Sequence, residues 1–151
     1  MEKLIRTNSK NSDFIGLVSL LDADLAKRDG EDHGFYDQFN GITHLNHTLV
    51  LYKDEIPVAC GAIKKFDETS VEVKRMFVQP QYRGHGLASK IVLELENWAR
   101  ELDFTSRVLE TGKRQPEAIA LYKKNGYTII PNYPPYEGIE NSVCFKKILN
   151  S

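Results

Sequence analysis

The stretch Gln81-Tyr82-Arg83-Gly84-His85-Gly86-Leu87-Ala88 lies between a strand-like run and a long amphipathic pattern. A helix N-terminus offers unpaired backbone N–H groups and about half a positive charge, which together attract a phosphate. Gly84 and Gly86 carry no side chain that would keep a pyrophosphate from the backbone, and Arg83 adds a charged donor. The stretch therefore predicts an anion-binding turn, although a glycine turn that merely enters a helix fits the same residues.

Two other phosphate motifs compete for this stretch. A P-loop needs G-x-x-x-x-G-K-[ST], which the sequence lacks. A dinucleotide-binding turn needs G-x-G-x-x-G directly after a strand and an acidic residue about 20 residues later. Gly84-x-Gly86-x-x-Ser89 followed by Glu110 imitates that pattern, but Pro80 intervenes and no second mononucleotide half follows. We therefore disfavour the dinucleotide interpretation.

Around this stretch, alternating and helical patterns of apolar residues predict the secondary structure. The predicted strands are Lys3–Thr7, Thr48–Tyr52, Pro57–Lys65, Ser70–Val78, Arg107–Glu110, Thr128–Ile130 and Ser142–Ile148. The predicted helices run from the N-cap candidates Asn11 and Ser12 to Gly30, from Leu87 to Leu102, and from Pro116 to the stop at Asn125-Gly126. Strands two to four read as an antiparallel meander, so the order indicates an α/β domain with a mixed sheet covered by helices.

The pattern also predicts which side chains share a face in the strand Ser70–Val78 and in the helix from Leu87. Strict alternation over Ser70–Val78 puts Val71, Val73, Arg75 and Phe77 on one face, with a charge on each face that hints at a cleft. The helix from Leu87 has an expected apolar stripe and a supportive i, i+4 pair between Glu96 and Arg100. The stripe consists of Leu87, Ile91, Leu95, Trp98 and Leu102.

Composition sets the limits of the function. The 151 residues are expected to form one domain, 1–151. The 20 basic and 21 acidic residues give a net charge of −1. This charge favours neither nucleic acid nor an anionic membrane as partner. Neither a secretory signal nor a membrane-spanning run is expected. Cys60 and Cys144 lie far apart in the sequence and lack metal-binding spacing, so no metal is expected. We predict that both are buried thiols in a cytoplasmic protein.

A second motif makes the pattern specific. The segment Gln115–Tyr127 contains A-x-x-L-Y-x-x-x-G-Y, and Met76-Phe77-Val78 precedes the glycine stretch. Together with Q-x-x-G-x-G, these resemble the GCN5-related N-acetyltransferase (GNAT) family over about Thr48 to Leu149. The resemblance implies a mixed, mostly antiparallel sheet that is splayed at the acyl-CoA site, with helices on both faces, and acetyl-CoA as co-substrate.

The resemblance also implies which residues hold the CoA moiety. Backbone N–H groups of the loop would hold the pyrophosphate, and the end of the strand before it would bond the pantetheine arm. Gln115 stands where many members have Asn, which puts that contact in doubt. The implied residues are Phe77, Val78, Gln81, Arg83, Gly84, His85, Gly86, Leu87, Ala88, Gln115, Ala118 and Tyr122. Candidate local cations are Arg83, Lys113, Arg114, Lys123 and Lys124.

For catalysis, the resemblance makes Tyr122 the acid that protonates the departing thiolate, with a packed core tyrosine as the alternative. The acceptor amine must lose a proton, and Glu72 and Glu110 are both candidates for that base, as is an ordered water chain. Glu110 could instead hold the acceptor's ammonium. Candidate acceptor-lining residues are Tyr36, Phe39, Asn40, Tyr133 and Tyr136.

Two functions follow from this sequence. The first is an N-acetyltransferase that moves an acetyl group to a small-molecule primary amine by direct transfer in a ternary complex, because neither cysteine falls in a motif. The second is a non-catalytic module of the same fold that binds acyl-CoA or a metabolite. The intact loop and Tyr122 favour the enzyme. Family members often pair through late strands, so a homodimer is left open.

Overall fold

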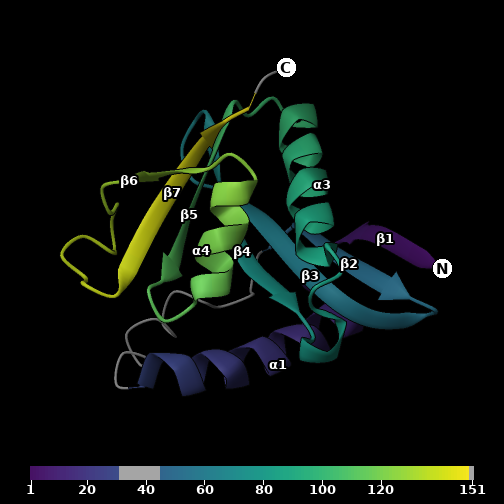
Figure 1. Ribbon diagram of the computed structural model, residues 1–151. Helices are drawn as coiled ribbons and strands as arrows, with labels where there is room; N and C mark the ends of the chain where they lie inside the picture. The colour runs from purple at the N-terminus through teal and green to yellow at the C-terminus, as the bar shows by residue number, and fades with distance from the viewer. Residues whose placement is uncertain (31–44, 150–151) are drawn as a thin grey trace.

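The computed structural model describes residues 1–30 and 45–149, and its strands form one seven-stranded sheet with the order β1-β2-β3-β4-β5-β7-β6 (Figure 1). The strands are β1 (Glu2–Thr7), β2 (His47–Lys53), β3 (Ile56–Lys65), β4 (Ser70–Val78), β5 (Ser106–Gly112), β6 (Thr128–Ile130) and β7 (Ser142–Ile148). The helices are α1 (Ser12–Asp29), the short 3-10 helix η2 (Pro80–Tyr82), α3 (Leu87–Glu101) and α4 (Pro116–Lys124). The predicted strands and helices in this part of the chain are confirmed, with small shifts at their ends.

The sheet is mixed, as predicted, and it opens in the middle. Strands β1 to β4 are consecutive antiparallel neighbours, and β5 pairs antiparallel with β7 over its whole length. Among the described strands, the one parallel pairing joins β4 to β5, and it covers only the register from Ser70↔Ser106 to Glu72↔Val108. Beyond Glu72 the two strands separate, so the predicted splay is confirmed. The backbone edges exposed by this separation become available to a ligand.

A bulge in β4 overturns the predicted alternation of its faces. The pairing of β3 with β4 shifts between Cys60 and Ala62, and Arg75 opposite this shift has φ 57°. The extra residue restarts the alternation, so Arg75 and Phe77 turn toward α1, whereas Val73 remains on the face of α3. The prediction that Val71, Val73, Arg75 and Phe77 share one face is therefore wrong after position 74.

Helix α1 covers one face of the sheet. Its N-cap is Asn11, whose side chain accepts a hydrogen bond from the backbone N–H of Phe14 at 2.9 Å, as the sequence predicts. Phe14 is fully buried, and it belongs to a cluster in which α1 packs on β2, β3 and β4. Removing this apolar surface from water holds the helix against the sheet. The members from α1 are Phe14, Leu17, Val18 and Leu21.

Helix α3 packs on the opposite face, and its buried side is wider than the predicted stripe. Leu87, Ile91 and Leu95 are buried as expected, but Leu102 is 38% exposed and Trp98 lies at the edge against the guanidinium of Arg6. The helix instead buries Val92, Glu96 and Ala99. Because 3.6 residues make a turn, a stripe of fixed heptad spacing drifts around the helix.

The predicted i, i+4 pair of Glu96 with Arg100 is present, but Glu96 has closer partners in the core. The Glu96 side chain is 1% exposed, and its carboxylate lies 3.8 Å from Arg100 but 3.0 Å from Nζ of Lys147. Glu96 also accepts a hydrogen bond from Tyr127 Oη at 3.2 Å. These partners come from β7 and from the residue that follows the α4 stop, far away in sequence.

Helix α4 begins with Pro116 and ends at Asn125, followed by Gly126 with φ +88°, as predicted. Both cysteines are buried and free, which confirms the prediction of two buried thiols. Among the helices of residues 1–30 and 45–149, none is long and apolar enough to cross a membrane.

Candidate active site

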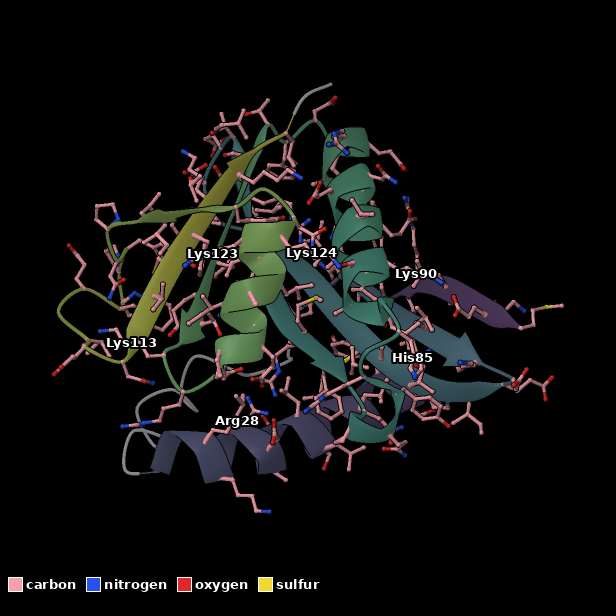
Figure 2. The ribbon with its side chains drawn as sticks, viewed as in Figure 1. Arg28, His85, Lys90, Lys113, Lys123 and Lys124 are labelled. Carbon is pink, nitrogen blue, oxygen red and sulfur yellow. The ribbon has the colours of Figure 1, made fainter. Side chains whose placement is uncertain are left out.

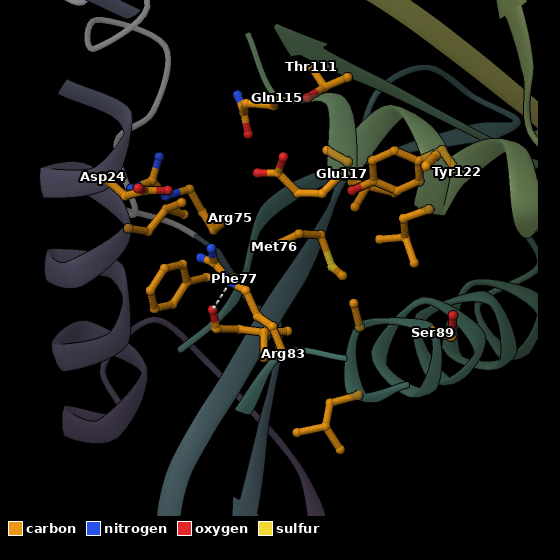
Figure 3. Close-up of a pocket in the computed structure, with 18 of the residues that line it drawn as sticks. Asp24, Arg75, Met76, Phe77, Arg83, Ser89, Thr111, Gln115, Glu117 and Tyr122 are labelled. Atoms are coloured by element: carbon orange, nitrogen blue, oxygen red, sulfur yellow. Dashed lines mark hydrogen bonds between the residues drawn. The ribbon is translucent and has the colours of Figure 1, made fainter. Parts of the chain in front are cut away.

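A cavity of about 440 Å3 occupies the region where β4 and β5 separate. Its walls come from α1, the open edge of β4, the start of α3, the end of β5 and one side of α4 (Figure 3). The residues on these walls are far apart in sequence, because the splay brings the turn after β4 next to α4. The cavity therefore runs from the glycine loop to the last paired residues of β4 and β5.

At one end of the cavity, the glycine loop has the geometry of an anion cradle. Gly84 and Gly86 have φ of +86° and +76°, and a Cβ added at either position would meet no heavy atom within 4 Å. Gly86 is the N-cap of α3 and makes no side-chain cap hydrogen bond, so the first-turn N–H groups of Leu87 and Ala88 lie at the cavity wall. These residues fit a bound pyrophosphate.

Most of the residues assigned to the cofactor meet at this cavity. Phe77, Val78, Arg83, Gly84, Gly86, Leu87, Ala88, Gln115, Ala118 and Tyr122 all line it. Gln81 and His85 belong to the same loop but are exposed outside the lining, and Gln81 donates to the side chain of Gln79 at 3.3 Å.

Arg83 reaches from the loop to the end of β4. Its Nε donates a hydrogen bond to the carbonyl of Val78 at 2.9 Å, and its guanidinium carbon lies 5.7 Å from the ring centroid of Phe77 (Figure 3). The carbonyl of Val78, which the family resemblance assigns to pantetheine, is thus already a hydrogen-bond acceptor. A ligand that uses this carbonyl has to share it with Arg83.

Of the five candidate cations, two line the cavity. Arg83 lies at the loop, and Lys124 extends from α4 on the side of α3 (Figure 2). Lys113, Arg114 and Lys123 lie outside the lining. Lys113 belongs to the turn after β5, where its backbone N–H donates to Asn141 at 2.7 Å.

Tyr122 projects from α4 with its hydroxyl end toward the cavity (Figure 3). Its side chain is 5% exposed, and its ring packs edge-on against Tyr127 at a centroid distance of 5.5 Å. Burial raises the pKa of Tyr122 to about 12, while the charge of Arg107 opposes that rise. The phenol therefore stays protonated at neutral pH, as a proton donor requires, and Tyr122 is both a packed and a cavity-lining residue.

At the other end of the cavity lie the two carboxylates that the sequence singled out. Glu72 on β4 accepts a hydrogen bond from the hydroxyl of Tyr133 at 2.8 Å and lies 3.6 Å from Nζ of Lys74. Glu110 lies on β5, two residues beyond Val108, which pairs with Glu72. In parallel strands paired residues point to the same face, so Glu72 and Glu110 share one face at the start of the splay. Tyr136 completes this end and is 2% exposed.

Sequence reasoning missed the charged residues that α1 and α4 bring to the cavity. Asp24 and Glu117 line it, and Arg28 joins them by ion pairs that link α1 to α4. Burial disfavours ionisation of Glu117, but its backbone hydrogen bond and Arg28 outweigh burial and lower its pKa. Arg28 and Glu117 stand 89 positions apart, so no local signal could have paired them.

Arg75 was also missed, because the bulge turns it toward α1, where its guanidinium pairs with Asp22. It lines the cavity, and its side chain is 2% exposed. Three of the predicted acceptor residues, Tyr36, Phe39 and Asn40, lie outside the described residues.

The comparisons with known proteins agree with this geometry. The model of the acetyltransferase (GNAT) family matches residues 14–127. A crystal structure from Klebsiella pneumoniae, assigned as an acyl-CoA N-acyltransferase, is 31% identical, covers 99% of both chains and has a TM-score of 0.83.

Two further relatives are similar in different ways. The IAA acetyltransferase of Azospirillum brasilense is 39% identical over 89 residues, and this match spans 58% of each chain. The PaiA N-acetyltransferase of Thermoplasma acidophilum, solved with coenzyme A, is 13% identical but has the same fold, with a TM-score of 0.73 over 98% of this chain and 99% of that one.

Proposed function

The chain belongs to the acetyltransferase (GNAT) family, and from this premise we propose that it moves an acetyl group from acetyl-CoA to the primary amine of a small molecule by direct transfer. The observation that carries the proposal is a single cavity with an anion cradle at one end and two carboxylates at the other. Tyr122 lies on the wall of this cavity. One domain, 1–151, supplies all of these groups.

The loop end supports acetyl-CoA as co-substrate. Gly84 and Gly86 leave open space at the start of α3, and Arg83 and Lys124 add positive charge on the cavity wall. A pyrophosphate placed against these N–H groups would gain charge-assisted hydrogen bonds. The pantetheine arm would then follow the open edge of β4 past Phe77.

The reaction joins the acceptor's nitrogen to the acetyl carbonyl carbon and breaks the C–S bond to CoA. The acceptor's nitrogen loses one proton, and the departing sulfur gains one from the hydroxyl of Tyr122, which is then reprotonated. The products are an N-acetylated amine and CoA with a free thiol. Burial keeps Tyr122 protonated until this step.

The far end of the cavity supports a small amine as the acceptor. Glu72 and Glu110 come from neighbouring strands and share one face, so one can take the proton while the other holds the ammonium. The ion pair of Arg28 with Glu117 joins α1 to α4 beside this space. The two carboxylates match the positive charge of an amine acceptor, and a small amine fits a cavity of about 440 Å3.

Direct transfer is supported by the state of the thiols. Burial raises the pKa of Cys60 to about 12 and that of Cys144 to about 11, so both stay protonated near neutral pH. A protonated, buried thiol is a poor nucleophile. An acyl-cysteine intermediate is therefore disfavoured, and two free thiols fit a reducing cytoplasm.

The first experiment is a calorimetric titration with acetyl-CoA, with NAD as the control ligand. We expect micromolar binding of acetyl-CoA and none of NAD. Absence of acetyl-CoA binding would contradict the proposal, and NAD binding would favour the dinucleotide interpretation instead.

An acceptor screen over polyamines, amino acids and aminoglycosides, read by release of CoA thiol, then tests the transfer itself. With the acceptor in hand, Glu72→Gln and Glu110→Gln are compared over pH. The base is the residue whose substitution removes the acidic limb of the kcat profile, and the other should chiefly raise the KM of the amine. If neither substitution changes either parameter, the assignment of this end to the acceptor is wrong.

A further inference from the structure

A cluster of charged side chains lies in the core directly behind the wall that carries Tyr122. We call Glu96, Arg107, Tyr127 and Lys147 the Glu96 cluster. The carboxylate of Glu96 accepts hydrogen bonds from Lys147 at 3.0 Å and from Tyr127 at 3.2 Å, and Nη1 of Arg107 lies 3.6 Å away. The side chains of Glu96 and Arg107 are 1% and 0% exposed. An ionic group thus occupies the space between α3, β5 and β7.

The hydrogen bonds of Arg107 leave its charge poorly satisfied. Nη1 donates to the carbonyl of Val92 at 2.8 Å, but Nε and Nη2 find no hydrogen-bond partner among residues 1–30 and 45–149. An unsatisfied buried donor costs about 1–3 kcal/mol, and more when it is charged. A buried ion pair can often be replaced by apolar residues at no loss of stability. Packing alone therefore gives no reason for a guanidinium at this position.

The geometry of the neighbouring rings shows what this charge acts on. The guanidinium carbon of Arg107 lies 5.7 Å from the ring centroid of Tyr127, and the Tyr127 ring meets Tyr122 edge-on at 5.5 Å. Arg107 and Tyr122 therefore both contact the ring of Tyr127, and in this buried region of low dielectric the charge of Arg107 acts beyond its nearest neighbour. Arg107 opposes the rise in the pKa of Tyr122 that burial produces.

The effect of Arg107 on the pKa of Tyr122 matters for the transfer of a proton to the departing sulfur. A thiol has an ordinary pKa of about 8.5, so a phenol with a higher pKa is a reluctant donor to the departing thiolate. A nearby cation lowers the free energy of the phenolate that remains after the transfer. The other cation on the cluster, Lys147, lies 5.6 Å from the centroid of Tyr127 and bonds to Glu96 and the carbonyl of Asn125.

We propose that Arg107 is a positioning residue for acetyl transfer, whose buried charge, held beside Glu96 and packed on Tyr127, stabilises the phenolate that Tyr122 forms. The proposal rests on the proposed function, because it takes Tyr122 as the proton donor. In the step, the O–H bond of Tyr122 breaks and its proton joins the sulfur of CoA as the C–S bond breaks. The phenolate then regains the proton that the acceptor's nitrogen has lost.

The test reads the ionisation of residue 122 without any turnover. A fluorinated tyrosine, whose phenol ionises nearer neutral pH, is placed at position 122 and titrated by fluorine NMR. We expect Arg107→Met to raise its pKa by at least one unit and Arg107→Lys to restore most of that shift. A pKa that stays the same in Arg107→Met overturns the proposal, because a purely structural role leaves the ionisation unchanged.

A substitution of Arg107 alone leaves Glu96 as an uncompensated buried charge, so the charge-neutral variant Arg107→Met with Glu96→Gln is measured in parallel. Circular dichroism and acetyl-CoA calorimetry show that each variant is folded and binds. The same rise in the pKa of residue 122 is expected in the neutral variant. If the rise occurs only in the singly substituted protein, it reflects the stranded carboxylate and the proposal is wrong.

A kinetic cycle separates this inference from the proposed function. Arg107→Met is expected to lower kcat about tenfold with Tyr122 present and less than twofold in Tyr122→Phe, with acetyl-CoA affinity unchanged. Equal losses in both backgrounds overturn the inference alone. If Tyr122→Phe has no effect on kcat while Arg107→Met still moves the pKa of residue 122, the proposed role of Tyr122 is wrong and the electrostatic coupling is right.

Discussion

The two ends of the cavity are built in different ways. At the loop end, consecutive residues from Arg83 to Ala88 present backbone N–H groups and two open glycines at the start of α3. At the far end, Glu72, Glu110 and Tyr136 are side chains from segments that meet only because β4 and β5 separate after their third paired residue. The loop end depends on local backbone geometry, whereas the far end depends on the tertiary arrangement of the sheet. Substitutions should therefore affect the two ends separately.

The largest expected effect comes from closing the loop end. Gly86→Ala puts a methyl group into the open space before α3 and strains a residue with φ +76°. We expect acetyl-CoA affinity to fall about a hundredfold, or roughly 2.8 kcal/mol, by calorimetry. Gly138→Ala is the matched control, because Gly138 has φ +75° and open space but lies outside the cavity. Equal affinity losses in the two variants would show that strain, and not occlusion, explains the result.

The next effect lies between the two ends, at Tyr122. Tyr122→Phe removes the proposed proton donor but keeps the packing against Tyr127, so we expect kcat to fall at least about tenfold with little change in acetyl-CoA affinity. Tyr52→Phe is the control, since Tyr52 bonds to Asp13 at 2.6 Å and lies outside the cavity. Unchanged turnover in Tyr122→Phe under saturating substrates would remove Tyr122 from the catalytic residues.

A substitution at Gly61 tests whether the far end can be disturbed alone. A Cβ here would lie 2.5 Å from Sδ of Met76 and 2.7 Å from Cγ2 of Ile91, opposite the bulge in β4. Gly61→Ala should lower the free energy of unfolding by about 1–3 kcal/mol in urea titrations. It should also raise the acceptor KM severalfold, and acetyl-CoA affinity measured in parallel shows whether the effect extends to Phe77 and the start of α3.

Gly16→Ala in α1 is the opposite case, because nothing lies within 4 Å of its added methyl group. It should raise the free energy of unfolding by about 0.5–1 kcal/mol, since alanine is the better helix former. A Gly61→Ala protein as stable as Gly16→Ala would mean that the bulge adjusts freely and does not hold the far end in place.

A further effect of similar size concerns stability alone and tests the burial of Tyr122 through its dependence on pH. Its pKa is raised from 10.0 to about 12, so the folded state holds this proton more tightly than the unfolded state does. The stability from this difference is complete below pH 10 and is lost as pH rises toward 12. When the pH is raised from 9 to 11, the free energy of unfolding measured in urea should fall by about 1 kcal/mol less in Tyr122→Phe than in the parent protein. An equal fall in the free energy of unfolding of both proteins would indicate that the phenol is exposed to solvent.

Much of the fold could be predicted because its signals are local. The apolar spacing of α1 and its Asn11 cap, the meander from β2 to β4, and the Pro116 start of α4 all depend on neighbouring residues. The prediction failed where a distant partner decides the outcome. The helical spacing predicted the pair of Glu96 with Arg100, but it could not predict that Lys147 and Tyr127 also bond to Glu96 in the core.

The sequence by itself determined the loop end of the cavity, because glycine conformations and helix N-termini are properties of adjacent residues. It also determined that Tyr122 would belong to a helix after a proline start. Only the tertiary structure decided which carboxylates meet, which face Arg75 occupies and that Arg107 lies behind Tyr122. Those outcomes depend on a one-residue bulge and on the separation of β4 from β5. The arrangement that forms is the one stabilised by packing between segments far apart in the chain.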